Sequence, residues 1–407
     1  MRTLLRSPLS LVLFALAGCH ATSSEGWRAY QRGDVAQASA IARPLAEAGQ
    51  ADAQYLYGFL MDEGAGCPED DAGAAHWYAE AAAQGHPHAT LELGRLYYSG
   101  SGVDLDHDRA ATLFAQAADQ DLPAAYSNLG LLHLFGHGVE RDTDRAVELI
   151  ERGARRGDAN GQRLMGTLYY EGVGVEEDRS EAARWFELAA ENGHVEAARR
   201  LGVMYLRGDG RPKDMTLARR WLERAAELGS PQAQFLIGCL LQEGLGGGAD
   251  GEAAVAWFRL AERNGVAAGS LSLGLAYLRG EGVERDEQQA AAWIRRAADA
   301  DVPRAKYDLG LLYLQGRGVD QDSDQAVRWF ERAARDGVAM AHVRLGSMHE
   351  QGAGVEADAL EAFKHYGMAA ALGDPSAMAE ADRLRDTLTA YQRADAQRMA
   401  FDWQTQN

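Results

Sequence analysis

Two groups of alternating aspartates have the spacing of a calcium-binding loop. They are Asp104, Asp106 and Asp108, and Asp320, Asp322 and Asp324. Carboxylates on alternate residues can surround a hard cation such as Ca²⁺. The glycine needed at the sixth loop position is replaced by Arg109 and Gln325, although Glu331 does occupy the twelfth position of the second group. We therefore predict that these aspartates begin helices, where negative charge favours the helix dipole, and that no metal is bound.

Other residues that could do chemistry do not form a convincing set. His86 and His88 flank Pro87 and could bind a metal, but two histidines alone are more often ordinary surface. The run from Gly246 to Gly248 is not followed by the Gly-Lys-Ser/Thr of a phosphate loop, and neither a zinc-protease motif nor a serine-hydrolase motif occurs. The sequence predicts a protein that is not an enzyme and has no cofactor.

A glycine recurs every 36 residues along most of the chain. The nine positions are Gly58, Gly94, Gly130, Gly166, Gly202, Gly238, Gly274, Gly310 and Gly346. Counting this glycine as position zero, tyrosine is frequent at +3, glycines stand at +6 and +8, and tryptophan occupies +19 in six units. A strict period of this length indicates a stack of structural repeats.

The columns of each unit predict two helices joined by turns. Apolar and small residues recur at spacings of three and four, as in amphipathic helices. The paired glycines end the first helix, and the glycine at +27 ends the second, because both turns need a positive φ. The tryptophan is expected to fill the space between helices, which small residues allow to approach closely.

This pattern, "LGxLYxxGxGVxxDxxxAxxWxxxAAxxG", resembles the Sel-1-like repeats, which are related to tetratricopeptide repeats. The resemblance covers 51–382 and implies an all-α solenoid of helical hairpins wound as a right-handed superhelix. Residues 19–50 are expected to include a degenerate helical pair that caps the stack, and 383–407 a capping helix and tail. The C-terminal features are Leu384, Leu388, Tyr391, Phe401 and Trp403.

The N-terminal segment has the features of a secretion signal. Arg2 and Arg6 precede a short apolar run, and Leu16-Ala17-Gly18 stands directly before Cys19. This arrangement resembles the lipobox of bacterial lipoproteins. The resemblance implies that 1–18 is removed and that Cys19 carries lipid, for which palmitate is the expected acyl chain. Because His20, not aspartate, follows the cysteine, the family rule implies an outer-membrane protein that faces the periplasm.

The charge and the cysteines limit the kinds of partner. The chain has a net charge of −19, and because 1–18 contains two arginines and no acidic residue, the remainder carries −21. Such a charge repels phosphate backbones, so no nucleic-acid partner is expected. Beyond Cys19 only Cys67 and Cys239 remain, too far apart in a solenoid to form a disulfide.

A candidate binding strip follows from the columns that vary. Positions −2, +1 and +5 of the first helix share one face and differ between units. In three successive units they are Asn128, Leu131 and Phe135, then Leu164, Thr167 and Glu171, then Arg200, Val203 and Arg207. The apolar and basic members indicate a partner-binding surface in an acidic protein. The alternative is that a neighbouring helix partly buries these columns.

The resemblance implies a scaffold that binds other envelope proteins or peptides. In layout the chain is similar to the outer-membrane lipoprotein that supports the alginate-export porin, although no residue identifies a polysaccharide system. Two other hypotheses stay open: an immunity protein that neutralises a toxic effector in the periplasm, and a penicillin-binding hydrolase. The penicillin-binding hypothesis is disfavoured because the Sel-1-like proteins reported to bind penicillin carry paired cysteines in successive repeats, which this chain lacks.

Overall fold

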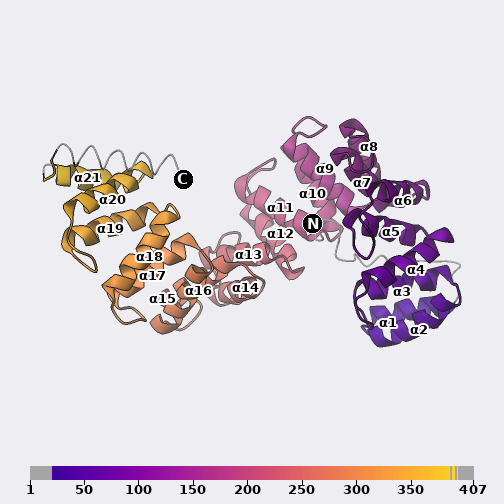
Figure 1. Ribbon diagram of the computed structural model, residues 1–407, viewed down its shortest axis with the longest axis horizontal. Helices are drawn as coiled ribbons and strands as arrows, with labels where there is room; N and C mark the ends of the chain where they lie inside the picture. The colour runs from indigo at the N-terminus through magenta and orange to yellow at the C-terminus, as the bar shows by residue number, and fades with distance from the viewer. Residues whose placement is uncertain (1–20, 386, 390–391, 393–407) are drawn as a thin grey trace. The chain divides into compact units, whose positions relative to one another are not determined.

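The computed structural model describes residues 21–385, 387–389 and 392 (Figure 1). Every regular element in this part of the chain is an α-helix, so the predicted all-α repeat fold is confirmed. None of these helices is long and apolar enough to cross a membrane. The whole N-terminal segment discussed above, including Cys19 and His20, lies outside the described residues, as do Tyr391, Phe401 and Trp403.

Helices alternate between the first and the second member of a hairpin (Figure 1). The first members are α1 (Ala21–Gln31), α3 (Ala51–Asp62), α5 (Pro87–Ser99), α7 (Pro123–Phe135), α9 (Ala159–Glu171), α11 (Val195–Arg207), α13 (Pro231–Glu243), α15 (Ala267–Arg279), α17 (Pro303–Gln315), α19 (Ala339–Gln351) and α21 (Pro375–Arg385). The second members are α2 (Val35–Glu47), α4 (Asp71–Ala83), α6 (His107–Asp119), α8 (Thr143–Arg155), α10 (Arg179–Glu191), α12 (Met215–Glu227), α14 (Gly251–Arg263), α16 (Glu287–Asp299), α18 (Ser323–Arg335) and α20 (Ala359–Ala371).

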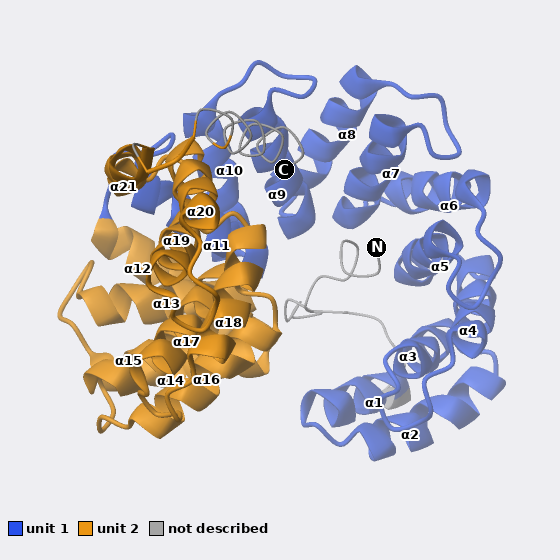
Figure 2. Cartoon of the chain, turned by 60° about the vertical axis from the view of Figure 1, so that its left-hand side comes forward, with its two compact units in different colours: residues 1–214 blue, residues 215–407 orange. Residues whose placement is uncertain are grey.

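The chain forms two compact units, 1–214 and 215–407 (Figure 2). The first unit contains α1 to α11 and the second α12 to α21. Within each unit, every helix packs against the next one along the chain. In the first unit the hairpins follow one another along an arc (Figure 2). Each repeat therefore buries its apolar residues mainly against its two neighbours, as in other solenoids.

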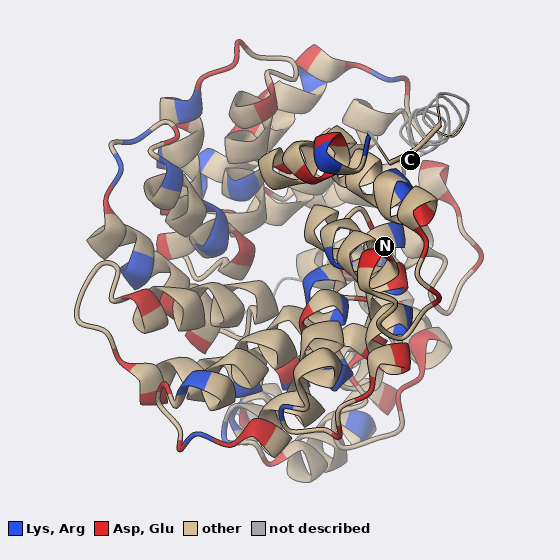
Figure 3. Ribbon diagram, turned by 90° about the vertical axis from the view of Figure 1, so that its left-hand side faces the viewer, with Lys and Arg blue, Asp and Glu red and all other residues tan. Residues whose placement is uncertain are grey.

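Aspartates begin most of the second helices. Asp106 and Asp322, from the two calcium-like groups, each accept a hydrogen bond at 2.9 Å from the backbone N–H three residues later. This satisfies one of the donors that a helix start leaves without a partner. Acidic segments recur in the connecting loops (Figure 3). The interpretation of these aspartates as helix starts is confirmed.

The paired glycines perform two different tasks in the loop after each first helix. Gly100 ends α5 in the left-handed conformation, with φ of 70°. Gly102 also has a positive φ, and a Cβ atom there would lie 2.2 Å from the backbone of Asp71 at the start of α4. The second glycine therefore lets the loop touch the preceding hairpin.

The repeating glycine at position zero packs against the residue at position +20, one place after the expected tryptophan. In eight of the nine units a Cβ atom on the glycine would lie within 3.0 Å of this side chain. The residues at +20, which we call the packing column, are Tyr78, Phe114, Ile150, Phe186, Leu222, Phe258, Ile294, Phe330 and Tyr366, and all are buried.

The tryptophan column takes part in filling the space between the helices, since Trp185, Trp221 and Trp329 are buried, but the packing column is buried more deeply. Trp329 keeps 8% of its surface exposed, whereas its neighbour Phe330 has none exposed. On the second helix of each pair, the two positions are adjacent and differ by about 100° in direction. The packing column points at the glycine, and the tryptophan lies at the edge of the core.

A buried polar side chain at position −4 joins successive hairpins. Gln162 on α9 donates to the carbonyl oxygen of Ala154 at 3.1 Å and accepts from Asn192, at position +26, at 2.8 Å. The pairs Gln54–Gln84 and Gln234–Asn264 repeat this arrangement, and Lys306–Asp336 replaces it with an ion pair. We call these four pairs the polar clasps. They satisfy buried polar atoms at the ends of helices.

Both ends of the described chain carry additional helices. At the start, Trp27 on α1 packs its ring 5.5 Å from that of Phe59. At the other end, Leu384 and Leu388 are buried beside Tyr366 and Phe363. The boundary predicted at residue 382 falls inside α21, which begins at Pro375 in the register of a further first helix. The stack thus continues into its cap without a break.

Candidate binding site

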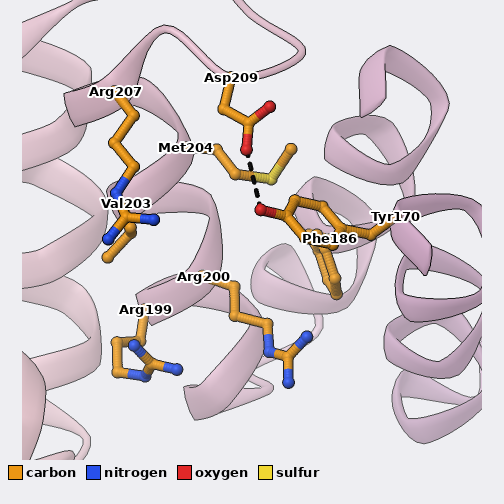
Figure 4. A pocket seen from close by; sticks show the side chains of 8 residues that line it. All are labelled: Tyr170, Phe186, Arg199, Arg200, Val203, Met204, Arg207 and Asp209. Atoms are coloured by element: carbon orange, nitrogen blue, oxygen red, sulfur yellow. Dashed lines mark hydrogen bonds between the residues drawn. The ribbon is translucent and has the colours of Figure 1, made fainter. Parts of the chain in front are cut away.

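A pocket of about 230 Å³ lies in the first unit between α9, α10 and α11 (Figure 4). Its lining residues come from all three helices and from the loop that follows α11. They are Tyr170, Phe186, Arg199, Arg200, Val203, Met204, Arg207 and Asp209. A single repeat supplies only part of this set, so the pocket exists because hairpins stack.

The apolar part of the lining is rigid. Phe186 is 1% exposed and packs against Gly166, where a Cβ atom would be 2.7 Å from its ring. Met204 is 4% exposed, and Val203 beside it is half-buried. These side chains cannot turn away without disturbing the core, so the pocket is expected to keep its shape in the absence of a ligand.

Arginines dominate the polar part of the lining. Arg199 and Arg200 both donate to Glu196, at 2.6 Å and 2.9 Å. Burial alone would raise the pKa of Glu196, but these hydrogen bonds outweigh it and hold the pKa below its usual value. The guanidinium of Arg200 also lies 5.7 Å from the ring centre of Phe186. Arg207 is exposed and forms no ion pair with any described residue.

A fourth arginine adds to the positive charge near the pocket. The pKa of Arg163 on α9 is lowered, first by burial and then by the neighbouring charge of Arg200. We call Arg163, Arg199, Arg200 and Arg207 the arginine group. Glu196 bridges two members of this group and Asp158 lies near Arg163, so the four positive charges exceed the two neighbouring negative charges by two. The whole chain, by contrast, has a net charge of −19.

Asp209, the one acid in the lining, is held by other partners. The hydroxyl of Tyr170 donates to it at 2.9 Å, as Figure 4 shows, and Arg179 donates to it at 2.9 Å. Arg179 also lies 4.3 Å above the ring of Tyr170. Since Arg179 already balances Asp209, this carboxylate does not neutralise the arginine group.

The residues of the predicted binding strip lie in different environments in the structure. Arg200, Val203 and Arg207 line the pocket. Asn128 is only 6% exposed and Leu164 only 9%, so the prediction of a surface position was wrong for these two. Stacking buries them, as the alternative interpretation allowed. Of the others, Leu131 and Thr167 are half-buried, Glu171 is exposed, and none of the three lines the pocket.

Phe135, the remaining residue of the strip, belongs to a separate aromatic cluster. It is 57% exposed and its ring centre lies 5.7 Å from that of His137. His137 in turn stacks on His107 at 4.7 Å and contacts the hydroxyl of Tyr98 at 3.3 Å from Nδ1. This cluster and the pocket are two distinct surface features of the first unit.

Column analysis missed Tyr170, Phe186, Arg199, Met204 and Asp209. It compares positions on one helix, whereas the pocket combines positions from three helices and a loop. One pattern in the sequence could have indicated the Tyr170–Asp209 contact. Its two residues are 39 positions apart, and the contacts Tyr98–His137 and Gln242–Glu281 have the same separation.

The histidines are explained by the fold. His86 accepts a hydrogen bond from the backbone N–H of Ala89 at 3.1 Å and thereby begins α5. Burial, followed by the charge of His88, lowers the pKa of His86 to about 4. The buried His342 and the half-buried His365 form a pair with their Nδ1 atoms 3.0 Å apart. Among the described residues, no three histidine, cysteine or acidic side chains are placed to hold a metal ion.

The two described cysteines are protonated at neutral pH. Burial raises the pKa of the Cys67 thiol, and burial together with the charge of Glu243 raises the pKa of Cys239 to about 11. A thiol needs a lowered pKa to act as a nucleophile, so neither residue has the character of a reactive cysteine.

The helical hairpins, glycine turns and stacked cores define a helical-repeat protein of the tetratricopeptide-like class. Nine segments match the model described as Sel1 repeat: residues 51–86, 87–122, 123–158, 159–194, 195–230, 231–266, 268–302, 303–338 and 339–374. The chain therefore belongs to the Sel1 repeat family. Repeats of this family mediate protein–protein interactions.

Two solved structures are similar over most of the chain. One is a protective antigen of uropathogenic Escherichia coli strains that displays an SLR fold; it is 29% identical, with a TM-score of 0.53, over 94% of this chain and 91% of that chain. The other is a Sel1 repeat protein from Oxalobacter formigenes, which is 28% identical with a TM-score of 0.50 over 85% and 99% of the two chains.

A third relative matches only locally. Chitin synthase regulatory factor 3 of Schizosaccharomyces pombe is 40% identical over 78 residues, which are 19% of this chain and 8% of that protein. The chain thus spans less than a tenth of the length of that protein.

Proposed function

We propose that this protein is a lipid-anchored scaffold that binds other envelope proteins on the periplasmic side of the outer membrane. The observation that carries the proposal is the pocket between α9, α10 and α11, where an apolar floor and an unbalanced arginine group meet on a rigid Sel1 stack. Preformed surfaces that combine buried apolar groups with arginine are typical of protein-binding sites.

The anchor rests on the N-terminal sequence. Leu16-Ala17-Gly18 before Cys19 has the form of a lipoprotein cleavage site, and the preceding apolar run is too short for a stable membrane span. Several acyl chains on one residue would hold the protein firmly at the membrane, since a single chain binds only weakly. The scaffold would then present its repeats close to membrane-bound partners.

We expect Cys19→Ser to release the protein from membranes. Without a thiol to receive lipid, the chain would lose the acyl chains that hold it in the bilayer. Membrane fractionation of cells that produce the full-length chain measures the effect, with Cys67→Ser as the matched control that should remain in the membrane fraction. Equal retention of Cys19→Ser and the wild type in detergent-extractable membranes would contradict the lipid anchor.

We expect the pocket to be required for partner capture. Crosslinked affinity purification of the full-length protein from envelope membranes should recover specific proteins, and Arg200→Gln/Arg207→Gln should reduce their yield about tenfold, as loss of charge-assisted hydrogen bonds predicts. Arg145→Gln/Arg155→Gln is the matched control, because these exposed arginines of α8 pair with glutamates of their own helix.

The identity of the captured proteins separates the alternatives. Several envelope components lost together from the pocket variant would support the scaffold. One toxic effector as the dominant partner would replace the scaffold with an immunity function. Recovery of the same partners with both double variants would show that the scaffold binds through a different surface.

A further inference from the structure

We infer that the pocket binds an acidic segment of its protein partner, in which carboxylates flank a large apolar side chain. The inference rests on the proposed function and adds to it the chemistry of the partner. It follows from three properties of the pocket: its unbalanced charge, its apolar floor and its size.

The charge of the pocket calls for carboxylates. Arg199 and Arg200 share a single glutamate, and Arg207 has no carboxylate partner among the described residues. Guanidinium groups have five donors each, so the shared hydrogen bonds to Glu196 leave donors of Arg200 available. One carboxylate of an incoming segment at Arg200 and a second at Arg207 would each gain charge-assisted hydrogen bonds.

The fixed position of Asp209 favours this arrangement. Tyr170 and Arg179 occupy its carboxylate, as their distances of 2.9 Å show. If Asp209 instead turned towards Arg207, it would compete with a partner for that guanidinium. Figure 4 shows the hydrogen bond from Tyr170 that holds it on the opposite side of the pocket from Arg199 and Arg200.

The floor of the pocket calls for an apolar group next to the carboxylates. Phe186 and Met204 are almost fully buried and form the base of the pocket, while the half-buried Val203 presents its methyl groups at the surface. An anion alone would leave these methyl groups exposed to water. A leucine or aromatic side chain would cover them and gain about 25 cal/mol for each Å² removed from solvent.

The size of the pocket fits one side chain of a longer segment. At about 230 Å³ it lies below the range of about 300 to 1,000 Å³ usual for small-molecule sites. The remaining contacts would therefore come from residues on either side of the inserted group. Those residues meet the guanidinium groups at the rim, which explains why the carboxylates are expected to flank the apolar residue.

Short peptides of defined composition test the inference on the full mature chain. Each carries one central leucine, phenylalanine or tryptophan, flanked by glutamates, by glutamines or by lysines. Fluorescence anisotropy with labelled peptides should show binding of the glutamate set, about tenfold weaker binding of the glutamine set, and none of the lysine set. Binding of the glutamate set should weaken as salt is added.

Variants place the binding in the pocket. Arg207→Gln should weaken the glutamate peptides about tenfold without affecting the fold, because this exposed side chain makes no ion pair with a described residue. Arg200→Gln should weaken them further, and circular dichroism would verify that loss of its contact with Phe186 leaves the helices intact. Arg145→Gln/Arg155→Gln should bind like the wild type.

Several results would overturn the inference. These are equal binding of glutamate and glutamine peptides, unchanged binding by Arg200→Gln/Arg207→Gln, or no binding of any peptide. Displacement by inorganic phosphate at constant ionic strength, with no preference for glutamate, would instead make the pocket a phosphate site. Self-association lost in the pocket variant would identify a second copy of the chain as the occupant.

The two proposals fail in different ways. One outcome is that the wild type and the pocket variant recover the same partners and that the peptides show no preference for glutamate. This outcome would contradict the binding of an acidic segment but not the scaffold function. Glutamate peptides bound through the arginines, with no partner recovered from membranes, would support the pocket chemistry and contradict the envelope scaffold.

Discussion

Gly238→Val is expected to destabilise the second unit by about 3 kcal/mol, at the upper end of what overpacking of a core costs. A Cβ atom at this position would lie 2.6 Å from the ring of Phe258, which is only 1% exposed. The ring is enclosed between α13 and α14 and cannot move aside without displacing a helix. Urea denaturation followed by circular dichroism measures the loss as a lower midpoint.

Gly248→Val is the control for this substitution. Nothing lies within 4 Å of a Cβ atom at Gly248, and its φ is not in the left-handed region, so we expect a change within about 0.5 kcal/mol. Gly238→Ala should cost less stability in a Phe258→Ala background than in the wild type if the clash with the ring is the cause. Equal midpoints for Gly238→Val and Gly248→Val would contradict the packing of the glycine on the ring.

Lys306→Ala is expected to cost about 2 kcal/mol, because it removes charge-assisted hydrogen bonds from a buried site. The ammonium group donates to Asp336 at 2.7 Å and contacts Asp301 at 2.8 Å, while the lysine side chain is 9% exposed. Asp301 stands where most units have glycine and takes a positive φ of 59°. Denaturation of the protein by urea, with protease resistance of α17 and α18 as a second measure, would detect the loss.

The chain contains its own replacement for this ion pair. Lys306→Gln/Asp336→Asn copies the clasp formed by Gln234 and Asn264, which meet at 2.8 Å. We expect the double substitution to recover most of the stability lost in Lys306→Ala, because a neutral pair can satisfy the same buried position. If the double variant is as unstable as Lys306→Ala, the ion pair and the amide pair are not equivalent.

The sequence was sufficient to predict the helices because each repeat carries its own start and stop signals. Asp106 and Asp322 mark helix starts, and Gly100 marks a helix end. These signals act within a few residues, so they can be read without knowledge of the stack.

Contacts between helices were harder to predict. The tryptophan is the largest residue of the repeat, but Phe258 and seven other residues of the packing column contact the repeating glycine. Which of two adjacent apolar residues faces the neighbouring helix depends on how the hairpin rotates during packing, and periodicity alone does not determine this.

At the candidate site, too, residues could be selected from one helix, but contacts between helices could not be predicted. Arg207 and Val203 could be selected because their columns vary between units. Leu164 was selected by the same reasoning but is buried, and Tyr170 was missed because it lies on another helix. A pocket made by three helices and a loop depends on their spatial arrangement, which no single column contains.

The polar clasps have a consequence for how such a gene can change. Each joins residues 30 positions apart, and the glycine contacts lie within one 36-residue unit, so all of them fit the same frame. Recombination that adds or removes a whole unit preserves the contacts between buried residues. An insertion or deletion of a few codons breaks them, because it changes the spacing of the paired residues. Lineages can therefore lengthen the stack by duplication and acquire new partners by exchanging the outward residues of one copy.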